Sequence, residues 1–92
     1  MRRKLHSESI TLVNRERITL RLYGTDDGLM LERELAELDG SSLIQVLPVA
    51  CTTTIRAFFS ADPYQTQIDA CFWHFYAKAD AYLGQTSAND CQ

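Results

Sequence analysis

The sequence predicts a small α+β domain in the order ββαββα, with a four-stranded antiparallel or mixed sheet and two helices on one face. Three patterns support this prediction. Residues 9–13 and 17–23 alternate polar and apolar side chains, residues 43–47 form a short apolar run, and residues 63–83 repeat apolar side chains at helical spacing. With 92 residues, 46% of them hydrophobic, we expect one domain over residues 1–86 and a polar tail at 87–92.

The first two predicted strands form a hairpin. Each carries its apolar residues on one side, Ile10 and Leu12 in the first and Ile18, Leu20 and Leu22 in the second. A two-residue loop would set Leu12 opposite Arg17, which mixes the core side with the solvent side. A three-residue loop at 14–16 sets Leu12 opposite Ile18. It also sets Ile10 opposite Leu20, so we expect this register.

The next segment reads as a helix followed by a strand. Asp26 or Asp27 can cap a helix that begins near Leu29 and ends at Gly40. Its predicted core stripe is Leu31, Leu35 and Leu38, with Glu32, Arg33, Glu34 and Glu37 on the wet side. Residues 43–47 are apolar on both faces, which predicts a central strand that Pro48 stops or bulges.

The last two elements are a predicted strand and a long helix. Residues 51–59 alternate, with Cys51, Thr53, Ile55, Ala57 and Phe59 on one face. Asp62, Pro63 and Gln65 then supply a helix start, and Gly84 supplies its end, so we expect a helix over about 63–83. The stripe that should lie on the sheet is Ile68, Phe72, Phe75, Ala79 and Tyr82.

The charge is split along the chain. The formal net charge is −3, but residues 1–23 hold six basic and two acidic side chains, and residues 24–92 hold three basic and ten acidic ones. With the apolar side of the hairpin inward, a basic and polar set faces outward. We expect this set to bind a partner: Arg15, Arg17, Thr19, Arg21 and Tyr23. The alternative is an edge hairpin kept soluble by its charges.

A second candidate surface lies on the long helix, opposite its core stripe. Ala70, Ala77 and Ala81 lie there beside the only tryptophan, Trp73, and Tyr76 lies on the flank. Small side chains allow close approach, and Trp and Tyr are frequent anchors of interfaces. We expect a contact with another chain at this face. The alternative is that the first helix or the N-terminal arm covers it.

Catalytic and metal-binding motifs are sparse. Cys71 and His74 lie one helical turn apart, and together with Cys51 they raise the possibility of a zinc site or a Cys/His nucleophile pair. Neither four ligands at recognisable spacing nor an orienting acid is visible. We therefore expect Cys71 to be a small buried residue, and we expect no enzyme activity, no cofactor and no metal.

The N-terminus and the cysteines indicate the compartment. The basic start is followed by polar residues rather than by the apolar run of a secretory signal, and no stretch is apolar enough for a membrane span. Cys51, Cys71 and Cys91 show no CxxC spacing and cannot all pair with one another. These features favour reduced thiols in a cytoplasmic protein.

The profile as a whole is similar to that of small phage-encoded inhibitors of bacterial defence complexes, in particular the anti-CRISPR proteins. It combines a compact chain, split charge, two aromatic-bearing faces and no catalytic motif; immunity proteins and integron-cassette proteins share it. The resemblance implies a stoichiometric protein-binding module from a phage or mobile element, acting in the cytoplasm of a bacterial host. It would occlude a protein or ribonucleoprotein complex that has both acidic (or RNA) and basic surfaces. The alternative is a small structural or regulatory homodimer that uses the Trp73 face as its interface.

Overall fold

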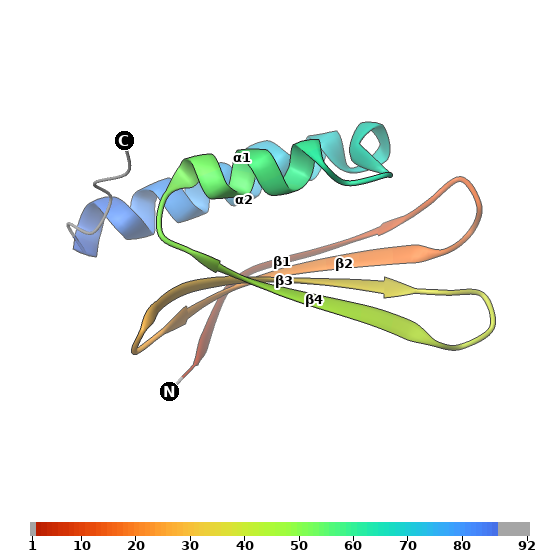
Figure 1. Ribbon diagram of the computed structural model, residues 1–92, viewed down its shortest axis with the longest axis horizontal. Helices are drawn as coiled ribbons and strands as arrows, with labels where there is room; N and C mark the ends of the chain where they lie inside the picture. The colour runs from red at the N-terminus through yellow and green to blue at the C-terminus, as the bar shows by residue number, and fades with distance from the viewer. Residues whose placement is uncertain (1, 87–92) are drawn as a thin grey trace.

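A computed structural model, which describes residues 2–86, shows one four-stranded antiparallel sheet with two helices on one of its faces (Figure 1). The elements are β1 (Arg3–Thr11), β2 (Arg17–Thr25), β3 (Gly28–Ala36), β4 (Ser42–Val49), α1 (Thr52–Ser60) and α2 (Gln65–Thr86). The predicted α+β class, with four strands and two helices, is confirmed. The predicted order is wrong, because all four strands precede both helices. The predicted tail at 87–92 lies outside the described residues.

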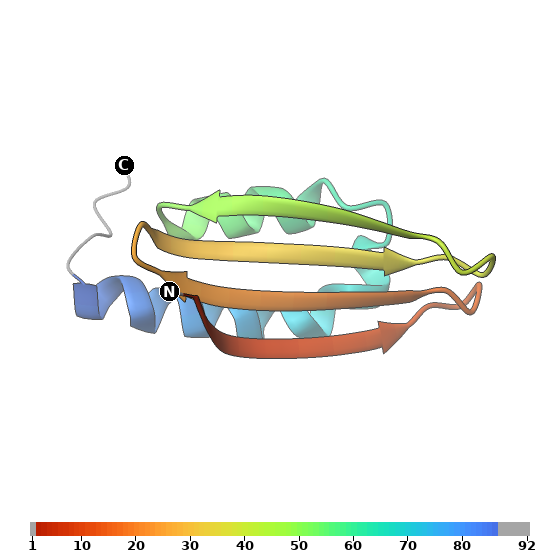
Figure 2. The ribbon, with the colours of Figure 1, turned by 90° about the horizontal axis from the view of Figure 1, so that it is seen from below.

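The sheet is a meander in the order β1-β2-β3-β4, in which each strand pairs with the next along the chain. The two helices run side by side across one face. α2 packs along β1, and α1 packs above β4, as the view onto the other face of the sheet shows (Figure 2). One face of the sheet is therefore covered and the other is open.

The first hairpin keeps the predicted faces but not the predicted register. Ile10, rather than Leu12, lies opposite Ile18, a shift of two residues. The three-residue loop comes one position earlier than expected, since the Leu12 amide donates to the Glu16 carbonyl at 2.7 Å. Arg15 completes this turn in the left-handed region at φ 74°, as three-residue hairpin loops require. Side chains alternate between the two faces of a strand, so a register shift of two residues leaves each side chain on its original face. The inward face of the hairpin therefore stays apolar.

The segment predicted as a helix from Leu29 is strand β3. Its residues alternate, and the even-numbered ones face outward while Leu29, Leu31 and Leu35 are buried. Leu38, predicted to be in the core, is 64% exposed. The composition favours helix, but pairing with β2 and β4 on both sides decides for strand. The turn before it is a tight hairpin in which Gly28 takes φ 127°.

The segment predicted as a strand at 51–59 is helix α1. Its buried residues, Thr52, Ile55 and Phe59, follow helical spacing. Ile55 and Phe59 are four residues apart, so they also fit the alternating pattern of a strand. The four strands of the sheet all precede this segment in the chain. The apolar face of the sheet still needs a cover beside α2, and α1 supplies it.

The core lies between the sheet and α2, as predicted. Of the predicted stripe, Ile68, Phe72, Phe75 and Ala79 are at most 9% exposed. Tyr82 is only partly buried, and the neighbouring Leu83 is buried instead. The helix continues through Gly84, which was expected to end it. Phe75 is fully buried and lies against the ring of His6 from β1, with the ring centroids 4.8 Å apart.

Candidate interaction surface

The side chains on the open face of the sheet change from polar and basic at one edge to apolar at the other. The registers align its outward residues in rows: Ser9–Thr19–Glu34–Ile44, Ser7–Arg21–Glu32–Val46 and Lys4–Tyr23–Met30–Pro48. Hydroxyl and basic groups therefore lie on β1 and β2, carboxylates on β3, and apolar groups on β4. Of the predicted outward set, Arg17, Thr19, Arg21 and Tyr23 lie on this face, and Arg15 lies in the turn. Their neighbours Glu32 and Glu34 had been expected on a helix.

Arg21 is the centre of this face. Its guanidinium donates to Glu32 at 3.0 Å and to Glu34 at 2.8 Å. The hydrogen bond to Glu34 raises the pKa of Arg21, and Glu32 adds to this effect while burial opposes it. Arg21 is thus neutralised within the sheet, so the basic surface expected from the sequence is smaller than its composition implies.

The other predicted residues of the hairpin differ in their availability. Tyr23 is 8% exposed, and the guanidinium carbon of Arg2 lies 4.2 Å from its ring centroid. Thr19 shares a hydrogen bond with Ser9 at 2.9 Å. Arg15 and Arg17 are exposed and form no ion pair with another described residue. These two arginines are the free charges of the set.

β4 is an edge strand, although its apolar run predicted a central one. Leu43, Ile44 and Val46 are each more than half exposed. No other strand among residues 2–86 pairs with its free side. The opposite edge, β1, is different, because it carries Arg3, Lys4 and a register irregularity, all of which discourage strand pairing. Pro48 is the one comparable feature of β4, and it is tolerated because the strand is at an edge.

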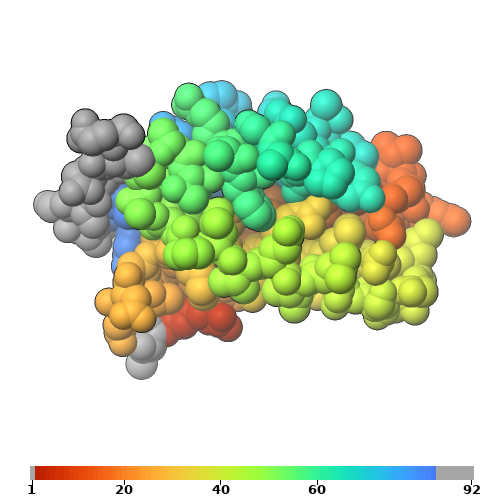
Figure 3. Space-filling view, in the orientation of Figure 1, coloured from red at the N-terminus to blue at the C-terminus, as the bar shows by residue number. Residues whose placement is uncertain are grey.

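A shallow groove runs between β4 and α1. It is lined by Leu47, Thr53, Thr54, Ala57 and Phe58. The space-filling view looks onto this side of the molecule, where β4 lies at the surface beneath α1 (Figure 3). The groove therefore lies on the helix-covered side of β4, to which Leu47 points, whereas Ile44 and Val46 point to the open face of the sheet.

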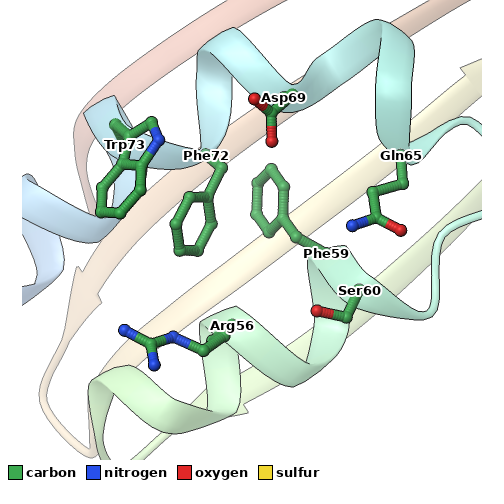
Figure 4. Close-up of a pocket in the computed structure, with 7 residues that line it drawn as sticks. All are labelled: Arg56, Phe59, Ser60, Gln65, Asp69, Phe72 and Trp73. Carbon is green, nitrogen blue, oxygen red and sulfur yellow. The ribbon is translucent and has the colours of Figure 1, made fainter.

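The helix face around Trp73 is the second candidate surface. Trp73 is 60% exposed, Ala70 and Ala77 are exposed, and Tyr76 is half-buried with Arg56 of α1 at 5.7 Å from its ring centroid. A pocket of about 180 Å³ opens beside it between the two helices (Figure 4). Phe59 and Phe72 form its apolar wall, and the volume is below that of common small-molecule sites. α1 therefore covers only one side of the α2 surface around Trp73.

A polar cluster joins β1 to α2 on the covered side of the sheet. Glu8 accepts hydrogen bonds from His6 at 2.6 Å, His74 at 2.8 Å and Cys71 at 3.3 Å. Burial raises the pKa of the Cys71 thiol to about 12, and Glu8 contributes to the rise. Cys71 is buried and free, as expected, whereas Cys51 is disulfide-bonded, so the expectation of reduced thiols is wrong there. A thiol that stays protonated is a poor nucleophile.

Comparison with models of known protein families, with curated proteins and with solved structures finds no significant match to this chain. Within residues 2–86, neither helix is both long and apolar enough to cross a membrane.

Two features of these surfaces were not predicted from the sequence. The exposure of β4 was missed because an apolar run at an edge is identical in sequence to one in the centre of a sheet. The cluster around Glu8 could have been found. Extending the alternation of Ile10 and Leu12 backwards by two and four residues places Glu8 and His6 on the inward face.

Proposed function

We propose that this chain is a non-enzymatic protein-binding module, an anti-CRISPR-like inhibitor that occludes a surface of a larger protein–nucleic acid complex. The observation that carries the proposal is the uncovered edge strand β4, whose Leu43, Ile44 and Val46 are each more than half exposed. Proteins normally protect such an edge with charge, a bulge or a covering segment. Apart from Pro48, β4 has none of these features, and an apolar edge of this kind is typical of a strand that pairs with another chain.

Three elements of the surface would share the binding. The free backbone groups of β4 would add a strand of the partner, and the groove at Leu47 and Phe58 would receive one of its side chains. The exposed Arg15 and Arg17 would meet an acidic protein surface or RNA, since no described carboxylate pairs with them. Glu32 and Glu34 of β3 lie between the two arginines and β4, and their charge would determine which partners bind.

The cluster at Cys71 supports a binding role over a catalytic one. A Cys/His enzyme needs a thiolate, and the raised pKa of Cys71 keeps the thiol protonated at neutral pH. Glu8 lies between the thiol and the imidazole of His74, so the two do not form a nucleophile–base pair.

Phage plaque assays in bacterial strains with active CRISPR systems of different types test this function. Expression of the chain should restore plaques of a targeted phage in at least one system, and Ile44→Asp and Val46→Asp should abolish the effect. Lys78→Asp is the control, since Lys78 is exposed on α2 and lies outside both β4 and the hairpin turn. Failure to protect in every system, or full protection by both β4 variants, would contradict the proposal.

The alternative function is a homodimeric structural or regulatory domain that uses the helix face around Trp73. The exposure of Trp73 beside Phe72 and Tyr76 favours it, because a desolvated aromatic cluster is a common interface anchor. Light scattering distinguishes the two functions. A dimer that Trp73→Ala converts to a monomer supports the alternative, and a monomer with the emission of a solvent-exposed tryptophan contradicts it.

A further inference from the structure

Three metal-binding side chains converge where the edge strand β1 meets α2. His6 and Glu8 are two residues apart on β1, so they point to the same side of the strand. That side faces α2, which places His74 above them. The ligand atoms of these three residues all lie within 4.8 Å of one another.

The geometry centres on one carboxylate oxygen. Nε2 of His6 lies 2.6 Å and Nδ1 of His74 lies 2.8 Å from the same Oε2 of Glu8. In a tetrahedral zinc site, ligand atoms about 2.05 Å from the ion are about 3.3 Å apart. Small outward shifts of the two rings would therefore admit an ion, and His74 is free to make one because its side chain is 61% exposed.

Neighbouring groups hold the ligands in position. The Cys71 thiol donates to the other oxygen of Glu8, Oε1, at 3.3 Å, which keeps Oε2 turned toward the two imidazoles. The buried ring of Phe75 packs edge-on against His6 with 4.8 Å between centroids. Partners of this kind, which orient a ligand without touching the ion, are a common feature of metal sites in proteins.

We propose that His6, Glu8 and His74 form a zinc site that clamps the edge strand β1 to α2. Two imidazoles and one carboxylate are a known three-ligand set for Zn²⁺, and the exposure of His74 leaves room for water at the fourth position. Ca²⁺ and Mg²⁺ are disfavoured because they require six or more ligands, nearly all oxygen. No metal was expected from the sequence, because Cys71 and His74 were combined with Cys51 and not with the residues of β1.

Titration of the full chain without a polyhistidine tag, after removal of metals with a chelator, tests the site. Calorimetry with Zn²⁺ should give one equivalent bound, and Co²⁺ should give the intense visible absorption of a tetrahedral site. His74→Gln should weaken Zn²⁺ binding by about tenfold or more. Because His74 is exposed, this variant should fold even if Glu8→Gln does not. Lys78→Gln is the control on the same helix and should bind Zn²⁺ like the wild type.

Thermal unfolding provides a second readout. Zn²⁺ should raise the unfolding temperature of the wild type and of Lys78→Gln, and should leave that of His74→Gln and His6→Gln nearly unchanged. The proposal is overturned if the chain binds no Zn²⁺, if His74→Gln binds it as tightly as the wild type, or if Mg²⁺ binds equally well.

Discussion

Arg33 of β3 and Asp62, which precedes α2, form an ion pair with two hydrogen bonds on the covered side of the sheet. Nε donates to Oδ2 at 2.6 Å and Nη2 donates to Oδ1 at 3.1 Å, and both side chains are at most 7% exposed. Oδ1 also accepts the Tyr64 amide at 2.8 Å. Asp62 therefore helps to begin α2 and attaches that end of the helix to the sheet.

Breaking this pair on one side should be strongly destabilising. Arg33→Met leaves the Asp62 carboxylate buried without its main partner, and we expect a loss of about 3–5 kcal/mol in the free energy of unfolding. Asp62→Asn should cost a similar amount, and the double variant should cost less than the sum of the two. Urea denaturation measures all three.

Arg21→Met is the control for this cycle. Arg21 also bonds two carboxylates, but its side chain is 24% exposed, so we expect a loss of about 0–1 kcal/mol. Equal losses for Arg33→Met and Arg21→Met would show that burial does not set the strength of these pairs.

Packing at Gly24 leaves little room for a methyl group, because the Tyr82 ring would have to shift to admit one. A Cβ at this position would lie 3.1 Å from the ring of Tyr82, which belongs to α2. We expect Gly24→Ala to cost about 1–3 kcal/mol through this overpacking, and Tyr82→Leu to recover part of the loss in the double variant. Thermal unfolding measures the change.

Gly84→Ala is the matched control, because a Cβ there meets nothing within 4 Å. Within a helix, this substitution should stabilise the protein by about 0.5–1 kcal/mol. A Gly24→Ala variant that is as stable as the wild type would mean that the Tyr82 ring moves away at no cost.

Cys71 should make stability fall at alkaline pH. Burial first, and then Glu8, raise its pKa from 9.0 to about 12. The folded state therefore keeps the proton while the unfolded chain releases it. Stability is unaffected by this group below pH 9 and declines as the pH rises from there toward 12. Denaturation of metal-free protein at pH 8 and pH 10 measures the decline, and Cys71→Ala should reduce it.

The same thiol should resist alkylation. At pH 9 the thiolate fraction is about one in a thousand, and the residue is 2% exposed, so iodoacetamide should modify Cys71 only after unfolding. Peptide mass spectrometry identifies the modified position. Rapid modification of Cys71 in the folded, metal-free protein would contradict both its burial and its raised pKa.

The free edge of β4 should drive weak self-association at high concentration. Val46→Lys places a charge among the exposed apolar residues Leu43, Ile44 and Val46 of β4. We expect light scattering to rise less steeply with concentration for this variant than for the wild type. The free energy of unfolding should change by no more than about 0.5 kcal/mol, because the side chain is 54% exposed. Wild-type scattering that does not rise with concentration would show that the edge does not pair with a second copy.

Prediction from periodicity was correct where the residues fit only one periodicity. The alternation at Ile18, Leu20 and Leu22 and the stripe from Ile68 to Ala79 each fit one kind of element, and both lie in the core as expected. It failed where two periodicities fit the same residues. Leu31 and Leu35 satisfy both a helix and a strand, and so do Ile55 and Phe59.

Local patterning is thus enough to predict the α+β class, the inward side of the first hairpin and the core stripe of α2, because each depends on residues close in the chain. The exposure of β4, the burial of Arg33 against Asp62 and the meeting of His6 and Glu8 with His74 depend on which distant segments pack together. The deciding factor is which segment lies beside a strand, because local sequence does not specify it. A β-strand completes its hydrogen bonds with its neighbours, so β2 and β4 make residues 28–36 a strand, and the absence of a fifth strand among the described residues leaves β4 open.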